Sequence, residues 1–237
     1  FDISINDSTS YSFVEYADIV QIINDKFGGL TGKSMNEINI ALLEKIINNN
    51  PFVLNAEVFS TVDGRLLIDV KQRNPVVRII NAFGENYYID EQGVFMPMCD
   101  KYSAQVPVAN GSILSKESQQ KIRIADSRWA DTSIHLSITE KVFMISEFIR
   151  SQEFWNAQVE QIYINTEGEI ELISRVGAQP VLFGDINDMK EKFEKLFLFY
   201  KEGLSKTGWN EYKFIDLRYK DQIVCLKNKA LVLYFLM

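Results

Sequence analysis

Residues 53–73 read VLNAEVFSTVDGRLLIDVKQR, and this stretch decides the fold of the first third of the chain. Leu66, Ile68 and Val70 recur at every second position, which is typical of a strand with one buried face. The pair Asp63-Gly64 separates this run from the preceding one, and Asp-Gly is a strong short-range signal for a two-residue hairpin turn. We therefore predict two antiparallel strands joined at residues 63–64.

Three elements are predicted upstream of this hairpin. Residues 2–5 form a short strand, and apolar residues three and four positions apart predict a helix that ends at Gly28-Gly29. Ser34 and Glu37 have the spacing of a capping box and predict the start of a second helix, which ends before Pro51. The predicted buried faces comprise Phe13, Tyr16, Ile19, Ile22, Ile23 and Phe27 in the first helix and Ile38, Leu42, Leu43, Ile46 and Ile47 in the second. The order strand, helix, helix, strand, strand predicts a small domain over residues 1–74.

The remainder, residues 75–237, is rich in predicted strands. These strands cover residues 76–80, 86–90, 94–98, 159–165, 169–176 and 180–184. One helix is predicted from Thr139 with an apolar face that extends to Trp155, and another from Asp188 to about Gly208. The latter is predicted to bury Met189, Phe193, Leu196, Phe197, Tyr200 and Leu204. Residues 111–131 form a polar excursion without an assigned role. The predicted fold class is α+β, with a mixed β domain and flanking helices after the first domain.

The sequence FIDLRYKDQIVCL, residues 214–226, predicts two short strands with a charged turn near Lys220-Asp221. Alternation places Ile215, Leu217 and Tyr219 on one face of the strand. It places Asp216, Arg218 and Lys220 on the other face, which is predicted to be exposed to solvent. A strand that ends a sheet exposes unpaired N–H and C=O groups, which can pair with another chain. The apolar stretch ALVLYFLM, residues 230–237, is an alternative occupant of that edge. In that case the edge that receives a partner strand would lie one strand further out.

Composition excludes several classes of function. A formal net charge of -7, with dispersed basic residues, argues against a nucleic-acid partner. No apolar run is long enough to span a membrane, but the chain begins within a strand, so we expect it to be part of a longer protein. Two cysteines, Cys99 and Cys225, permit a disulfide that nothing except their even number supports.

The chemical motifs give little support for an enzyme. GGLTGKS, residues 28–34, has one residue too few between its glycines for a phosphate-binding loop and follows a helix rather than a strand. The single histidine, His135, alternates with apolar residues and is interpreted as a half-buried strand residue. Glu169 and Glu171 alternate along a strand as a solvated face rather than as a catalytic pair. We predict no catalytic residue, no cofactor and no metal site.

The unit that contains NPFVLNAEV and GRLLIDVKQRNPVVRI resembles a POTRA domain of the FtsQ family of cell-division proteins, called DivIB in Gram-positive bacteria. The second half resembles the β domain of that family through YYIDEQGVFMP, EIELISRVG, VLFG and FIDLRYKDQIV. The resemblance covers essentially the whole chain and is nearest to the Bacteroidetes form. It implies a non-catalytic divisome scaffold in the inner membrane, with one membrane helix before the POTRA domain and the present region in the periplasm.

The resemblance also implies partners and a site. The β domain is expected to bind FtsB, itself paired with FtsL, by strand addition at its last strand, and the POTRA domain is expected to bind other division proteins. The site residues implied by position are Arg218, Tyr219, Gln222, Ile223, Val224, Cys225 and Leu226. Two alternatives remain open. One is a POTRA-containing component of outer-membrane assembly or secretion, and the other is a cell-wall hydrolase that uses carboxylates.

Overall fold

The computed structural model describes residues 1–6, 12–30, 32–114, 136–177, 179–204, 208, 211–227 and 231–235, the last range by its backbone. The predictions for His135 and for residues 115–131 of the excursion lie outside these residues. The chain forms two compact units. The first comprises Phe1–Pro75 with Met96–Ala104, and the second comprises Val76–Phe95 with Gln105–Met237. The domain division at residues 74 and 75 stays a prediction, because the segment Met96–Ala104 groups with the first unit.

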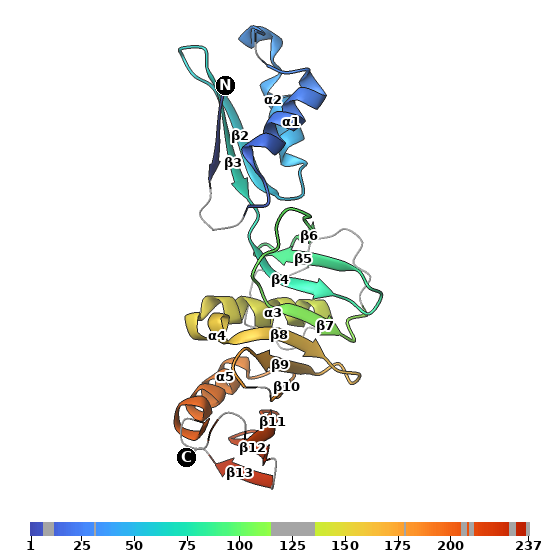
Figure 1. Ribbon diagram of the computed structural model, residues 1–237, viewed down its shortest axis with the longest axis vertical. Coiled ribbons are helices and arrows are strands. Elements are labelled where there is room, and N and C mark those ends of the chain that lie inside the picture. Colours follow the sequence, from blue (N-terminus) through green and yellow to red (C-terminus); the bar gives the residue numbers. More distant parts are fainter. Residues whose placement is uncertain are drawn as a thin grey trace. The chain divides into compact units, whose positions relative to one another are not determined.

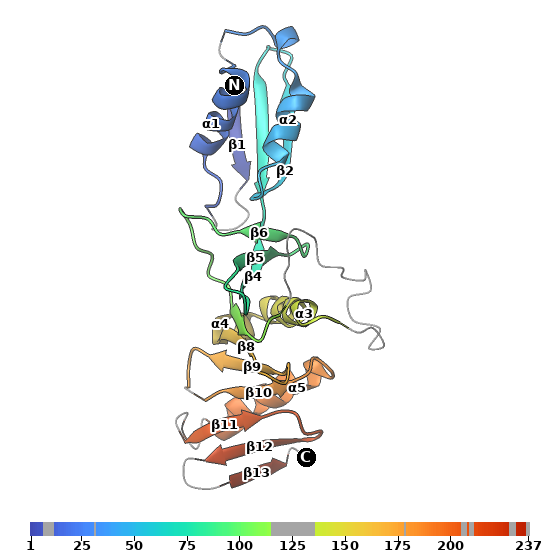
Figure 2. The same cartoon turned by 90° about the vertical axis from the view of Figure 1, so that its right-hand side faces the viewer.

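The first unit is a three-stranded sheet with helices on one face (Figures 1 and 2). Its elements are β1 (Asp2–Asn6), α1 (Tyr16–Phe27), a 3-10 turn (Met35–Glu37), α2 (Ile40–Asn48), β2 (Val53–Ser60) and β3 (Leu66–Gln72). The strand order is β1-β3-β2, with β1 parallel and β2 antiparallel to the central strand β3. This arrangement confirms the predicted element order.

Apolar side chains of both helices and of β3 form the core of this unit. The residues that are at most 1% exposed include Ile19, Ile23, Leu43, Ile47, Ile68 and Val70. Several details of the prediction were wrong. Tyr16 and Leu42, which were predicted to be buried, are 55% and 45% exposed. The capping box of Ser34 and Glu37 closes the 3-10 turn, whereas α2 begins later behind Asn39. The hairpin turn also differs, because Thr61 pairs with Arg65 and leaves three residues in the loop.

The second unit is built on a ten-stranded mixed sheet, of which Pro75 in β4 and Met96 and Pro97 in β6 group with the first unit. Its strands are β4 (Pro75–Ile80), β5 (Asn86–Asp90), β6 (Phe95–Pro97), β7 (Val108–Gly111), β8 (Val159–Ile164), β9 (Ile170–Ser174), β10 (Val181–Gly184), β11 (Tyr212–Asp216), β12 (Gln222–Lys227) and β13 (Leu231–Phe235). Their order is β13-β12-β11-β10-β9-β8-β7-β4-β5-β6. The predicted α+β class, a small unit with two helices and three strands followed by a mixed sheet with helices, is confirmed.

Three helices cover one face of this sheet (Figure 1). They are α3 (Ile138–Ser151), α4 (Glu153–Gln158) and α5 (Met189–Leu198), and a π-helical turn (Phe199–Leu204) continues α5. The helix predicted to reach Trp155 is broken at Gln152, and Phe197, predicted to be buried, is 41% exposed. Apolar residues of the three helices and of the inner sheet face form one core. Among the described residues, no helix combines the length and the apolar character needed to cross a membrane.

Candidate functional site

The last three strands of the ten-stranded sheet follow one another in space as they do in the chain (Figure 2). β11 pairs in parallel with β10 and antiparallel with β12, and Ile215 lies opposite Cys225. Ile223 and Cys225 are fully buried, while Val224 and Leu226 are half-buried. The alternation that the sequence shows therefore directs every second residue of β12 into the helix-covered core.

β12 is not the margin of the sheet, because the alternative occupant that the sequence left open, a strand within residues 230–237, lies there instead. The predicted receiving residues Gln222, Ile223, Val224, Cys225 and Leu226 are each opposite a residue of β13, from Phe235 to Leu231. The apolar residues of β13 lie antiparallel beside β12 and pair with main-chain groups that a sheet margin would otherwise expose to solvent. The strand at the margin is β13.

The turn between β11 and β12 carries Arg218 and Tyr219. β11 ends at Asp216, and Asp221 has a left-handed backbone with φ 59° that reverses the chain. Tyr219 is 48% exposed, whereas Asp216, predicted to lie on a wet face, is only 3% exposed. The turn therefore presents one aromatic side chain to solvent above a buried carboxylate.

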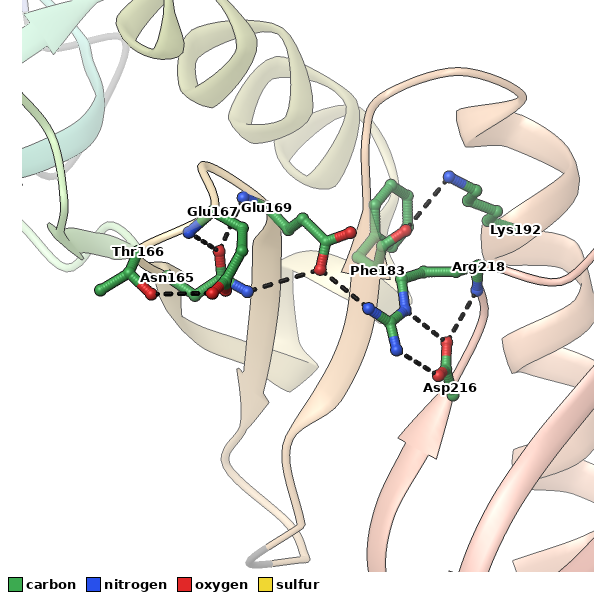
Figure 3. Close-up of polar contacts among 8 residues, drawn as sticks. All are labelled: Asn165, Thr166, Glu167, Glu169, Phe183, Lys192, Asp216 and Arg218. Carbon is green, nitrogen blue, oxygen red and sulfur yellow. Dashed lines mark hydrogen bonds and ion pairs between the residues drawn. The ribbon is translucent and has the colours of Figure 1, made fainter.

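Arg218 is held by two carboxylates of its own chain (Figure 3). Its Nε and Nη2 donate to the two oxygens of Asp216 at 3.0 and 2.7 Å, and its Nη1 donates to Glu169 at 2.8 Å. The Asp216 side chain, through these hydrogen bonds and its charge, raises the pKa of Arg218 above its ordinary value. The guanidinium therefore neutralises a nearly buried carboxylate, and its charge is already compensated within the chain.

Gly184, at the end of β10, lies directly beneath the Arg218 side chain. A Cβ at this position would be 2.7 Å from Cγ of Arg218, and Gly184 has φ 75°, a conformation that glycine adopts without strain. The absence of a side chain at residue 184 therefore lets Arg218 cross β10 and reach Glu169 on the far side.

Two lysines of α5 donate hydrogen bonds to main-chain carbonyl oxygens, one at the end of β10 and the other in the turn between β11 and β12. Lys192, only 9% exposed, donates from Nζ to the carbonyl oxygens of Phe183 at 3.1 Å and Asp185 at 2.6 Å. Burial lowers the pKa of Lys192, although nearby carboxylates oppose this shift. One turn later, Nζ of Lys195 donates to the carbonyl oxygen of Tyr219 at 2.9 Å. α5 thus fixes both β10 and the turn that carries Tyr219.

A cleft of about 510 Å³ lies between α5 and this turn, and Leu198, Tyr219 and Lys220 contribute to its lining. Three of the carboxylates that line it, Asp188, Glu191 and Asp221, form no ion pair with any residue that the structure describes. The cleft therefore brings these carboxylates together with the exposed ring of Tyr219.

The cysteines are free thiols, Cys99 half-buried and Cys225 buried. No group of three or more metal-ligating side chains gathers among the described residues. Sequence reasoning missed Gly184, Lys192 and Lys195, since the glycine was interpreted only as the end of a strand and lysines on a helix are usually solvated. It also missed that Glu169, interpreted as solvated, is a partner of Arg218.

Comparisons with known proteins agree with this architecture. Residues 74–226 match the family model described as FtsQ/DivIB, C-terminal related, and residues 1–71 match a POTRA-like domain. The chain is also similar to a protein named cell division protein FtsQ from Rhodothermus marinus. The two are 24% identical over 198 residues, which is 82% of this chain and 67% of that protein. The chain therefore belongs to the FtsQ/DivIB family and has a role in cell division.

Proposed function

We propose that this chain is a non-catalytic scaffold of the divisome that captures FtsB/FtsL-type partners by strand addition at the C-terminal margin of its ten-stranded sheet. The observation that carries the proposal is the position of β13, which among the described strands has β12 as its one neighbour. A strand in this position offers main-chain donors and acceptors to an incoming strand. The receiving strand is β13 rather than β12.

The opposite margin of the same sheet is a poorer receptor. β6 comprises only three residues, Phe95–Pro97, and proline has no N–H to donate. β13 comprises five residues, and none of them is proline. The two margins therefore differ in the number of main-chain groups that they can offer, and this difference favours capture at β13.

Tyr219 and Arg218 have different roles in this proposal. Tyr219 is a direct anchor, because its ring is half-exposed beside an open cleft. Arg218 holds the turn in place through hydrogen bonds from its guanidinium to the carboxylates of Asp216 and Glu169. An acidic residue of the partner would have to compete with both carboxylates, so we assign Arg218 a positioning role.

The family also suggests the cellular setting. We propose that a single membrane helix precedes residue 1, that the described region lies in the periplasm, and that the POTRA-like unit contacts other division proteins. FtsQ-family membership supports each of these points. Fusion of the full-length protein to a topology reporter at each end would test the orientation, and activity of the C-terminal reporter in the cytoplasm would contradict it.

Binding of the extracytoplasmic parts of FtsB and FtsL homologues, measured by calorimetry, tests strand addition. Adjacent residues of a strand direct their N–H groups to opposite sides, so Val232→Pro and Leu233→Pro form a matched pair. One variant removes a donor at the outer edge, and the other disrupts pairing with β12. We expect one variant to lose partner binding with little change in thermal stability and the other to lose both. Unchanged binding by both variants would refute capture at β13.

A further inference from the structure

The first unit has its own exposed sheet margin at β2, and side chains of α2 occupy that margin. Among the strands that the structure describes, the order β1-β3-β2 leaves one side of β2 without a neighbour. A strand so placed presents N–H and C=O groups at alternate residues. On β2, the N–H and C=O of Ala56 and the N–H of Val58 bind side chains of α2 instead of another strand.

Asn48 reproduces the bonds of a neighbouring strand. Its Nδ2 donates to the carbonyl oxygen of Ala56 at 3.0 Å, and its Oδ1 accepts from the N–H of Ala56 at 2.8 Å. A side-chain amide has the same donor and acceptor as a peptide group, so it can satisfy both main-chain groups of one residue. Asn48 therefore occupies the place of one residue of an added strand.

Glu44 extends this contact by one more position. Its Oε2 accepts from the N–H of Val58 at 3.1 Å. Glu44 and Asn48 are one helical turn apart and lie on the same helix face. A further hydrogen bond from Nδ2 of Asn48 to the carbonyl oxygen of Glu44, at 3.0 Å, fixes the asparagine amide in this orientation.

We propose that Asn48 and Glu44 act as a substitute strand that closes the outer edge of β2 to a second copy of this chain. An incoming strand would have to break three hydrogen bonds and displace the last turn of α2. A second copy is the natural occupant of an open edge, because two identical strands can pair antiparallel about a two-fold axis with main-chain bonds that do not depend on side chains. This inference is independent of partner capture at β13.

Amide hydrogen exchange of the whole chain, followed by NMR, tests the contacts directly. We expect Asn48→Ala to accelerate exchange at Ala56 and Glu44→Ala to accelerate it at Val58, each by about tenfold. The amide of Val70, on the central strand, reports opening of the whole sheet and should not change. Asn49→Ala replaces a neighbouring exposed asparagine and is the matched control. Unchanged exchange at Ala56 and Val58 would overturn the proposal.

Self-association tests the consequence. We expect Glu44→Ala/Asn48→Ala to form dimers in sedimentation equilibrium at concentrations where the wild type and Asn49→Ala are monomeric. Adding Ala56→Pro should restore the monomer, because proline removes the outward donor without removing a bond to β3. A monomeric double variant would overturn the proposal, and so would a dimer that persists with Ala56→Pro.

Discussion

Nζ of Lys195 donates a hydrogen bond to the carbonyl oxygen of Tyr219 at 2.9 Å. This contact joins the helix layer to the turn that carries Tyr219, whose side chain is 48% exposed. Helix α5 therefore fixes the position of the Tyr219 ring without covering it. The proposed anchor is thereby preorganised, which lowers the entropy lost when a partner binds.

Lys195→Met should weaken partner binding by about fivefold to tenfold, because the methionine keeps the apolar stem and removes the donor. Lys195→Arg should restore most of the affinity, since the guanidinium can also donate to a carbonyl. Lys190→Met is the matched control, because Lys190 is on the same helix and its side chain is 81% exposed. Equal binding by the Lys195→Met and Lys190→Met variants, measured by calorimetry, would show that the contact does not position Tyr219.

Tyr219→Ala should reduce partner binding by about 2 kcal/mol, the usual effect of removing a central aromatic anchor. Its effect on the free energy of unfolding should be small, because the side chain is 48% exposed. Tyr16→Ala is the control, since Tyr16 is 55% exposed and belongs to the first unit. Binding measured by calorimetry and unfolding measured in urea separate the two effects, and wild-type affinity for Tyr219→Ala would remove the proposed anchor.

Gly184→Ala should destabilise the second unit by about 1–3 kcal/mol, because the new Cβ meets Arg218 and the left-handed backbone becomes strained. Part of this cost depends on Arg218. In a double-mutant cycle, Gly184→Ala combined with Arg218→Ala should therefore cost less than the sum of the two single changes. Additive free energies of unfolding would show that the steric contact is not significant.

Elements with strong local signals could be predicted from the sequence. Asp63-Gly64 predicted the β2–β3 hairpin, although Thr61 and Arg65 close a three-residue loop around it. The apolar spacing of Ile19 and Ile23 predicted the buried face of α1. These features depend on neighbours in the chain, which periodicity and turn chemistry describe well.

Features that depend on how segments pack together could not be predicted in this way. The sequence left open whether residues 230–237 cover β12, because a continuous apolar run does not specify a strand partner. Lys192 looked like an ordinary helix-surface lysine, but it is buried because the ends of β10 present carbonyl oxygens beneath α5. Both features depend on how strands and helices pack together, which the periodicity of one segment does not show.

Burial in the core raises the pKa of Cys225 from 9.0 to about 12, with a smaller contribution from the nearby Asp216 carboxylate. Above pH 9 the unfolded chain releases this proton while the folded chain retains it, so stability falls as the pH rises from 9 towards 12. The loss should be about 1.4 kcal/mol per pH unit. Urea unfolding at pH 8 and pH 10 should show a larger decrease for the wild type than for Cys225→Ala. Equal decreases would contradict a protonated thiol at residue 225.

Removal of residues 228–237 tests which strand receives the partner. The truncated chain ends after β12 and loses all five pairs between β12 and β13, so β12 becomes the margin. If a partner pairs with the outer edge of β13, binding should weaken, because the groups that it contacts are gone. If β13 instead occupies the place that a partner takes, binding should tighten, because an intramolecular competitor has been removed. Calorimetry with the same FtsB/FtsL-type segments distinguishes these results, and Tyr219→Ala in the truncated chain shows whether the anchor is still used. We expect weaker binding; tighter binding would transfer the receiving role to β12 and make β13 its displaceable cover.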